Sequence, residues 1–174
     1  ARSRGGGPGG MPEKIDFSKV SFLIVDKSPL SAQLIRDILH ALGVTAIRIA
    51  DTAERARKML RRDAVDVIIT EHHLGEESGL ALIEWVRNAS DSLDRMTPII
   101  MLTANSEVDY VVRARDMGVT EFLAKPFNVE GLYRRLVAVI ARPRAFVNAD
   151  GYFGPDRRRR QVPYTGPDRR RSDD

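Results

Sequence analysis

Residues 20–43 read VSFLIVDKSPLSAQLIRDILHALG and contain the pattern from which the fold is inferred. The run SFLIV (21–25) is short, apolar and partly β-branched, as is typical of a buried strand. Helical spacing follows, with Pro29 suited to a first turn and Gly43 to a C-terminal stop. The apolar positions of that helix are Leu30, Leu34, Ile35, Ile38, Leu39 and Leu42. The segment predicts a strand followed directly by an amphipathic helix.

The same unit recurs as far as residue 141. Further strands are predicted at 45–50, 65–70, 98–102 and 120–124. Further helices are predicted at 53–62, 80–89, 107–116 and 129–141, with Thr52, Ser106 and Asn128 as caps and Gly79 before the second of them. Because the strands are apolar nearly throughout, both faces of the sheet are expected to be buried. The predicted fold is α/β, a five-stranded parallel doubly wound sheet with helices on each side.

The composition excludes several classes of protein. The chain has 174 residues, of which 43% are hydrophobic, and no cysteine. That content suffices for one packed domain, while no apolar run approaches the roughly 20 residues of a membrane span. A disulfide framework, a thiolate metal site and a thiol nucleophile are excluded. We expect a soluble cytoplasmic protein, since the N-terminus also lacks the apolar core of a signal peptide.

Composition divides the chain into three parts. The glycine-rich start predicts a flexible leader over 1–15, the periodic region a domain over 16–141, and the proline-, glycine- and arginine-rich remainder a tail over 142–174. Residues 151–174 contain seven arginines and four aspartates, a local charge of +3 out of +4 for the whole chain. The tail is expected to be disordered, because it cannot bury enough apolar surface to fold alone.

One unit occurs twice within the tail, at a spacing of twelve residues. Tyr152-Phe-Gly-Pro-Asp-Arg-Arg-Arg159 is followed by Tyr164-Thr-Gly-Pro-Asp-Arg-Arg-Arg171, and seven of the eight positions are identical. Such a match indicates duplication of a functional unit rather than coincidence.

Polar residues follow the predicted strands at the edge of the sheet where sites of parallel α/β proteins lie. Asp26 and Lys27 follow the first strand, Glu71 the third, Thr103 the fourth and Lys125 the fifth. These five residues are the candidate site of the domain.

The order and spacing of four segments resemble the CheY-like receiver domains of two-component signalling over residues 20–141. The segments are VDKSPLS at 25–31, IITEHHLGEESGL at 68–80, LTA at 102–104 and AKPF at 124–127, and Phe122 stands at the family's aromatic switch position. The resemblance implies a flavodoxin-like fold. It also implies a site in which two adjacent acids and a phosphorylatable Asp hold a magnesium ion, while a Thr or Ser and a Lys bind the phosphoryl oxygens.

The chain departs from that pattern at two positions, which makes it a degenerate receiver. Lys27 replaces the second acid, and Glu71 replaces the acceptor Asp. Asp26 and Glu71 against Lys27 and Lys125 sum to zero charge, so a divalent cation, which needs oxygen ligands, has nothing to neutralise. We expect no metal and, instead, an ion pair between Lys27 and Glu71. Phosphorylation is disfavoured because the extra methylene displaces the carboxyl by roughly 1.5 Å, and phosphoryl transfer depends on positioning.

His72 and His73 adjoin this site, with Glu76 and Glu77 nearby. We interpret them as residues of a solvated loop rather than metal ligands. Consecutive side chains of an extended chain point to opposite sides, which separates the two imidazoles.

Each tail repeat combines groups that match guanine. A Gly-Pro-Asp-Arg turn would fix the Asp relative to the arginines after it. Arg can donate two hydrogen bonds to guanine O6 and N7, Arg or Tyr can stack on the base, and Asp can accept from its N1–H and amine. Two such units predict a ligand with two guanines joined by phosphates, which is the form of cyclic di-GMP. The residues assigned to it are Tyr152, Asp156, Arg157, Arg158, Arg159, Arg160, Tyr164, Asp168, Arg169, Arg170 and Arg171.

A degenerate receiver followed by this duplicated tail resembles the CheY-like cyclic di-GMP effectors of alphaproteobacteria, the Cle proteins, over residues 20–172. That resemblance implies that the tail binds cyclic di-GMP and that the receiver then engages the flagellar motor switch protein. It places the partner on the face of the last two helices and the fifth strand, with Tyr110, Phe122 and Tyr133 near it. The protein would then be a non-catalytic signalling adaptor.

Other interpretations of the same residues stay open. The chain could be a phosphorylation-dependent response regulator with an incidental tail, a receiver protein that binds nucleic acid, or a domain with a merely solvated tail. The aspartates argue against nucleic acid, because carboxylates reduce the affinity that arises from counterion release. Membrane docking is disfavoured because no amphipathic helix accompanies the arginines.

Overall fold

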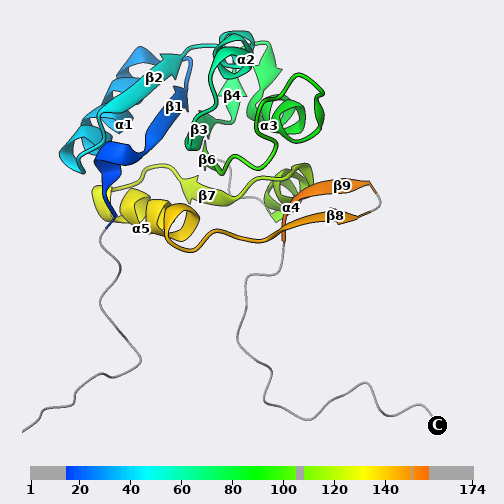
Figure 1. The fold of residues 1–174 in the computed structure, drawn as a ribbon. Helices are drawn as coiled ribbons and strands as arrows, with labels where there is room; N and C mark the ends of the chain where they lie inside the picture. Colours follow the sequence, from blue (N-terminus) through cyan, green and yellow to red (C-terminus); the bar gives the residue numbers. More distant parts are fainter. Residues whose placement is uncertain (1–14, 105–107, 150, 157–174) are drawn as a thin grey trace, which may run out of the picture.

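A five-stranded parallel sheet forms the centre of the structure, a computed structural model that describes residues 15–104, 108–149 and 151–156 (Figure 1). The strand order is β2-β1-β3-β6-β7. The strands are β1 (Ser21–Val25), β2 (Ala46–Ala50), β3 (Val67–Glu71), β6 (Ile99–Thr103) and β7 (Glu121–Ala124). Each lies within two residues of a predicted strand, so the predicted sheet is confirmed.

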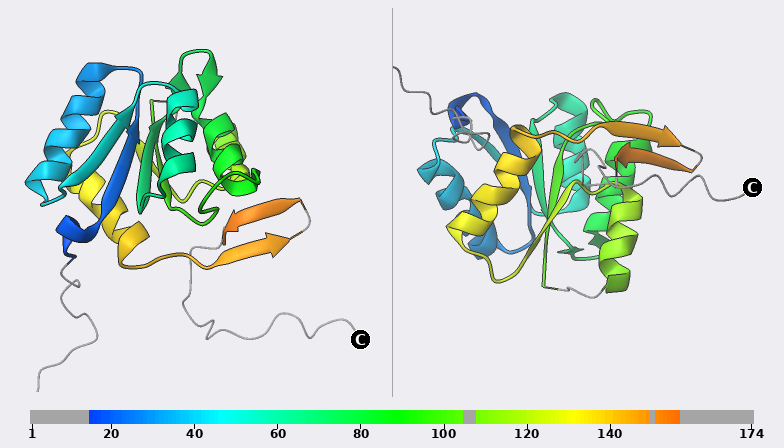
Figure 2. Two further views of the ribbon diagram at one scale, coloured as in Figure 1. Left: turned by 45° about the horizontal axis from the view of Figure 1, so that its top comes forward. Right: turned by 90° about the horizontal axis from the view of Figure 1, so that it is seen from below.

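Helices cover both faces of this sheet (Figure 2). One face carries α1 (Pro29–Ala41) and α5 (Val129–Ile140), and the other carries α2 (Ala53–Arg62), α3 (Gly79–Asn88) and α4 (Val108–Met117). The buried apolar residues accordingly form two clusters, one on each side. The core strands β3 and β6 are buried along their whole length, as expected of a doubly wound α/β fold.

Capping explains where several helices begin. In each case a side-chain oxygen accepts a hydrogen bond from the backbone N–H three residues on, which satisfies a donor that the first turn leaves unpaired. The caps are Ser28 of α1, Thr52 of α2, Ser78 of α3 and Asn128 of α5. Thr52 and Asn128 confirm two predicted caps, while Ser106 lies outside the described residues.

Smaller elements surround the sheet. A 3₁₀ turn, η1 (Phe17–Lys19), precedes β1 and buries Phe17 against the α1 and α5 side. After β3, the strands β4 (His73–Leu74) and β5 (Glu77–Ser78) pair antiparallel. Within the described residues, no helix is long and apolar enough to cross a membrane.

An antiparallel hairpin follows α5, inside the segment assigned to the tail. It consists of β8 (Phe146–Ala149) and β9 (Tyr152–Pro155), and β9 contacts α3 and α4 (Figures 1 and 2). The expected disorder therefore does not extend to residues 146–155. The segment folds because it buries Gly154 and Pro155 against the domain, rather than alone. Residues 157–174, with the second repeat, lie outside the described residues.

Candidate functional site

Four of the five predicted strand-end residues meet at the carboxyl edge of the sheet. Asp26 follows β1, Glu71 ends β3 and Thr103 ends β6. The backbone N–H of Lys125 donates to the carbonyl of Thr103 over 2.9 Å, which brings the lysine beside them. Its ammonium group forms an ion pair with Glu71 and lies 4.0 Å from the Asp26 carboxylate. Lys125 is therefore the centre of this site.

Lys27 does not join the group. Its side chain is exposed and, in the part of the chain that the structure describes, makes no ion pair with Glu71. It lines a separate hollow with Asp51, Glu54, Glu76 and Glu77. The predicted pairing of Lys27 with Glu71 is therefore wrong, because side chains alternate at the strand end: Asp26 points inward, and the next residue points outward. The inner group consequently has a formal charge of −1 rather than zero.

The residues at this edge do not fit a magnesium ion. Such an ion needs a nearly octahedral set of oxygen ligands. Here the Lys125 ammonium contacts Glu71 and faces Asp26, while the other oxygen of Asp26 accepts the backbone N–H of Ser28 over 2.9 Å. The lysine at position 27, where the resembled family has its second acid, faces away. The chemistry of this donor set therefore favours an internal ion pair.

The two histidines after β3 pack as a pair instead of separating. The ring centroids of His72 and His73 are 4.3 Å apart, and His72 also meets the edge of Tyr110 at 4.2 Å. The expectation that the two imidazoles point to opposite sides is wrong. Burial lowers the pKa of His72, and the charges of His73 and Arg113 lower it further against the opposing effect of Glu71. Among the described residues, no group of three or more acidic or histidine side chains could hold a metal ion.

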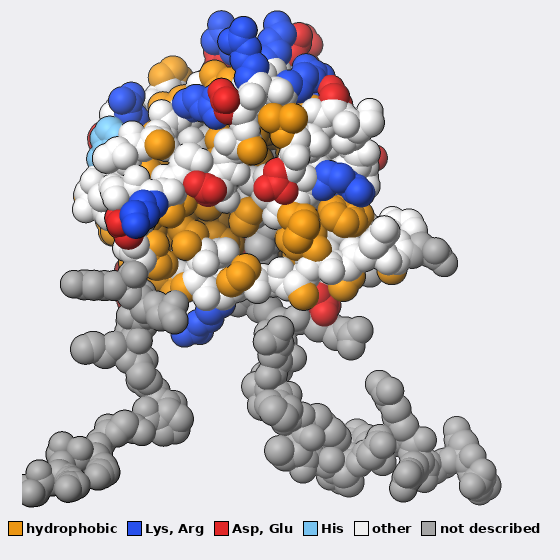
Figure 3. All heavy atoms as spheres, in the orientation of Figure 1, with side chains coloured by type: hydrophobic (Ala, Val, Ile, Leu, Met, Phe, Trp, Pro, Cys, Tyr) orange, Lys and Arg blue, Asp and Glu red, His pale blue; other side chains and the backbone are white. Residues whose placement is uncertain are grey.

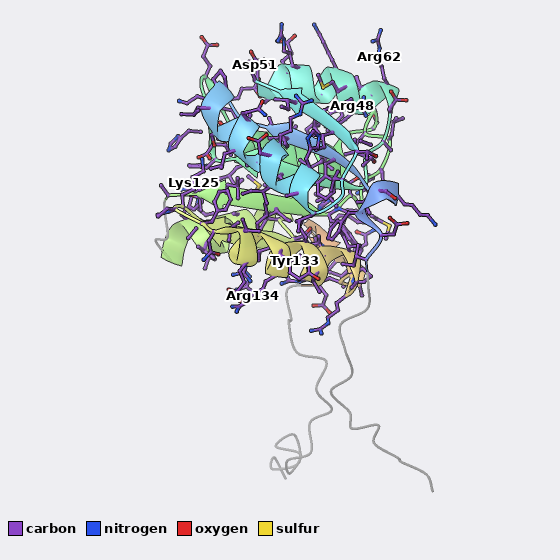
Figure 4. The ribbon with its side chains drawn as sticks, turned by 90° about the vertical axis from the view of Figure 1, so that its left-hand side faces the viewer. Arg48, Asp51, Arg62, Lys125, Tyr133 and Arg134 are labelled. Atoms are coloured by element: carbon purple, nitrogen blue, oxygen red, sulfur yellow. The ribbon has the colours of Figure 1, made fainter. Side chains whose placement is uncertain are left out.

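The three aromatic residues proposed for a partner surface do not gather on one exposed face. Tyr110 is buried, its hydroxyl donates to Met101 Sδ over 2.8 Å, and burial raises its pKa. Phe122 is half-buried against the same cluster. Tyr133 lies on α5 at the opposite side of the sheet, beside Phe17 (Figure 4). Tyr110 serves as a core residue here.

Comparison with known proteins identifies the domain. Residues 22–137 match the family of the response regulator receiver domain. The chain belongs to this receiver family. A chemotaxis protein CheY of Pseudomonas aeruginosa is 28% identical over 123 residues, which cover 71% of this chain and 98% of that protein. The regulatory protein VirG of Agrobacterium tumefaciens is 38% identical over 133 residues, 74% of this chain and 46% of VirG.

Solved structures give the same result. The chemotaxis protein CheY4 of Vibrio cholerae superimposes with a TM-score of 0.64 at 28% identity, covering 70% of this chain and 98% of that one. A putative response regulator of Chloroflexus aurantiacus reaches 0.65, also at 28% identity, covering 71% and 98%. These matches confirm the flavodoxin-like receiver fold. The hairpin β8–β9 lies C-terminal to the matched family region.

A buried arginine organises the opposite, amino edge of the receiver sheet. Arg87 of α3 is fully buried, and its guanidinium donates to the carbonyls of Gly118 (2.9 Å), Arg95 (2.8 Å) and Thr97 (2.7 Å). Burial lowers the pKa of Arg87 to about 10, so it keeps its charge at neutral pH. The sequence contained a sign that Arg87 is buried, because it lies one turn after Ile83 on the apolar side of α3.

Two arginines of this edge stack on the hairpin. The guanidinium of Arg87 lies 5.0 Å from the ring centre of Phe146, and that of Arg95 lies 3.8 Å from Phe153. Arg95 is held in place because its Nε donates to the Arg87 carbonyl over 2.6 Å. Each stack contributes about 0.5 to 2 kcal/mol, depending on its exposure. The aromatic residues of β8 and β9 thus attach to the receiver domain.

Close backbone contact completes the attachment. A Cβ atom at Gly154 would lie 3.1 Å from the Cα of Gly118, and one at Gly118 would lie 2.9 Å from Arg87 Cγ. Gly118 also has a φ of +105°, a conformation that favours glycine. Gly154 and Pro155 lie in β9 rather than in the predicted turn, because they pair with β8. The Asp156 N–H extends this ladder by donating to Ala145 over 2.7 Å.

The chain before the hairpin is tied to β7. Arg144 donates to the buried Glu121 carboxylate over 3.3 Å, and Arg135 of α5 lies 4.0 Å from its other oxygen. Glu121 begins β7, directly before Phe122. The linker to the tail therefore contacts the strand that lies between α4 and α5 in Figure 1.

The structure describes two of the eleven predicted ligand residues. Tyr152 is half-buried, and its hydroxyl donates to the Pro155 carbonyl over 2.7 Å. Asp156 stands directly after β9. The others lie outside the described residues: Arg157, Arg158, Arg159, Arg160, Tyr164, Asp168, Arg169, Arg170 and Arg171.

Basic side chains also gather over α2, at the top of Figure 3. Many of them are paired with neighbouring carboxylates. The ion pairs are Arg55–Asp51, Lys58–Glu54, Arg57–Glu77 and Arg61–Asp91. This pairing reduces the attraction of the surface for a polyanion.

Proposed function

We propose that the protein is a non-catalytic signalling adaptor, in which the C-terminal repeats bind cyclic di-GMP and the receiver domain passes the signal to a protein partner. The observation that carries the proposal is the way in which the first repeat leaves the domain. Pro155 is buried, and the backbone of Asp156 is bonded to Ala145. The run of ligand-binding arginines therefore starts from a fixed point on the receiver.

The chemistry of the repeats supports a ligand with two guanines. Each repeat offers a carboxylate for the N1–H and amine of guanine and guanidinium groups for O6, N7 and phosphate. Two repeats that each make one bidentate contact and one stack would contribute about 4 to 12 kcal/mol in total, against an ordering cost of roughly 2 to 5 kcal/mol. Both repeats are therefore needed for useful affinity.

The arrangement of the carboxyl edge supports a switch that works without phosphate. Glu71 is engaged by Lys125, and the residues there do not fit magnesium. Phosphoryl transfer would lack the metal and the aligned acceptor on which it depends. We therefore propose that the receiver binds no metal and that the dinucleotide takes the place of the phosphoryl group as the signal.

The flagellar motor switch protein is the proposed partner. A relative named chemotaxis protein CheY in Pseudomonas aeruginosa and one named probable chemotaxis protein CheY in Rhizobium etli support this assignment. The proposed surface is formed by α4, β7 and α5, because the Arg144–Glu121 contact links the base of the tail to β7. Phe122 and Tyr133 stay near this surface as proposed contacts, whereas Tyr110 is buried.

Calorimetric titration of the full chain with cyclic di-GMP tests the proposal. Asp168→Ala and Arg169→Ala should each weaken binding by about fivefold to 150-fold, because each removes guanine contacts worth about 1 to 3 kcal/mol. Arg62→Ala, an exposed arginine of α2, is the matched control and should leave the affinity unchanged. The proposal fails if the parent gives no binding heat or if both tail variants bind like the parent.

The nucleic-acid alternative predicts a different result. Mixed-sequence RNA would then bind with steep salt dependence, and cyclic di-GMP would not displace it. Competition between the two ligands on the full chain distinguishes these functions.

A further inference from the structure

The two repeats differ at one position of the eight, and that position is the one that stacks on the receiver. Phe153 of the first repeat lies under the Arg95 guanidinium at 3.8 Å. The second repeat has Thr165 there. The remaining positions, from the tyrosine to the third arginine, are the same in both. The single difference therefore coincides with a contact to the domain rather than with a predicted contact to guanine.

The receiver surface around Phe153 is preorganised to bind an aromatic ring. Arg95 is fixed by its bond to the Arg87 carbonyl, so its guanidinium plane is already oriented. Phe146 lies beside the Phe153 ring, with 5.7 Å between ring centres, and is itself stacked under Arg87. Gly118 leaves the room that the Gly154 backbone fills. Both repeats have this glycine, so the two repeats differ only in the aromatic ring of Phe153.

We propose that hairpin β8–β9 is a coupling element that fixes the first repeat on the receiver domain, and that Phe153 is the positioning residue that distinguishes this repeat from the second. This inference deepens the proposed function and rests on it. Threonine has no π face for a guanidinium, and it cannot bridge Arg95 and Phe146. The second repeat therefore supplies ligand contacts without a receiver contact of this kind, while the first connects the ligand to the domain.

The contacts of the docking site indicate where the coupling acts. Arg87 stacks on Phe146 of the hairpin, and it donates to the carbonyls of Gly118 and Thr97, which precede β7 and β6. These positions lie at the amino edge, so a displaced hairpin would act on β6 and β7 from the edge opposite to Glu71 and Lys125. Loss of the Phe153 stack should therefore separate binding of the dinucleotide from the response of the receiver.

A matched pair of variants tests this separation. Phe153→Ala removes the docking ring, and Thr165→Ala truncates the equivalent position of the second repeat. Arg95→Gln removes the same stack from the receiver side without altering the tail. Each full-length protein is titrated with cyclic di-GMP by calorimetry, and the Gly118 and Thr120 amides are followed by NMR in the same titration. Hydrogen exchange of the β8 and β9 amides is measured without ligand.

We expect Phe153→Ala and Arg95→Gln to bind cyclic di-GMP with a Kd within about threefold of the parent. Their Gly118 and Thr120 amides should no longer shift on binding, and the hairpin amides should exchange about tenfold faster without ligand. Thr165→Ala should behave like the parent in the amide shifts and the exchange. The calorimetric and NMR results together distinguish a positioning residue from a ligand contact.

Three results would overturn the inference. Amides of Gly118 and Thr120 that shift normally in Phe153→Ala would show that the hairpin does not couple ligand to domain. Loss of binding in Phe153→Ala would make Phe153 a ligand residue, and unchanged exchange without ligand would remove the docking role. A parent protein that gives no binding heat would instead overturn the proposed function, and this inference with it.

Discussion

The two edges of the receiver sheet place a cation in different kinds of surroundings. At the carboxyl edge, the Lys125 ammonium contacts Glu71, lies near Asp26 and donates to Ser31 Oγ over 3.3 Å, so its partners are polar side chains around the site. At the amino edge, the Arg87 guanidinium is held by backbone carbonyls and stacks on a ring of the hairpin. The contacts of Lys125 are made within the site itself, whereas those of Arg87 attach a segment from outside the sheet. In this chain, Glu71, which stands where the resembled receivers have their acceptor Asp, is held by an internal ion pair, and the attachment of the tail lies at the other edge.

Substitution of Arg87 by Met would remove the hydrogen bonds at the amino edge, and it has the largest expected effect on stability. The carbonyls of Gly118, Arg95 and Thr97 would lose their donor in a buried place, so the free energy of unfolding should fall by about 3 to 5 kcal/mol. Urea denaturation measures the change. Arg62→Met on the exposed side of α2 is the control and should change stability by no more than about 0.5 kcal/mol. A loss below about 1 kcal/mol in Arg87→Met would contradict the structural role of Arg87.

A pair of lysine variants sharpens the account of the carboxyl edge. Lys125→Met leaves the two carboxylates near each other without their cation, and stability should fall by about 2 to 3 kcal/mol, since the lysine side chain is partly exposed. Lys27→Met should change it by no more than about 0.5 kcal/mol, because Lys27 faces solvent. Chemical denaturation of both variants at neutral pH provides the comparison. The opposite order of effects would show that Lys27, and not Lys125, is the partner of Glu71.

Titration of His72, at the carboxyl edge, makes the stability of the folded protein depend slightly on pH. Its pKa in the folded protein lies below the unfolded value of about 6.5, so the unfolded chain binds the proton first as the pH falls. The stability associated with neutral His72 is therefore present above pH 6.5 or so and decreases as the pH falls from there towards the lower folded pKa. His72→Phe keeps a ring against Tyr110 and removes the titration. Its melting temperature should depend less steeply on pH between about 7.5 and 5.5 than that of the parent. Equal slopes would refute the assignment.

The sheet was predictable from the sequence because its signals are local. Each strand is an apolar, β-branched run, and residues such as Thr52 and Asn128 mark the helix starts through bonds to their own neighbours. The choice between Lys27 and Lys125 was also within reach, because alternation along the strand end places Asp26 inward and Lys27 outward. The summed charges of the site do not indicate where each side chain points, and for that reason they led to the wrong pairing of Lys27 with Glu71.

The hairpin could be predicted only in part. Phe146-Val147 and Tyr152-Phe153 flank an Asp-Gly dipeptide at 150–151, which is a strong hairpin signal that the arginine-rich composition obscured. Its docking was beyond sequence reasoning, since the site is assembled from α3, the loop before β6 and the start of β7. These elements meet only in the folded domain. In the sequence, the local sign of this docking site was an arginine, Arg87, at an apolar position of α3.

The central claim is that the segment after α5 receives the dinucleotide and that the receiver alone does not. The most direct test compares the intact chain with one that ends at Pro143, before the hairpin, in calorimetric titrations with cyclic di-GMP. Thermal unfolding first establishes that the shortened chain is folded. The account predicts binding heat from the intact chain and none from the shortened one. Equal heat and equal affinity in both would contradict it.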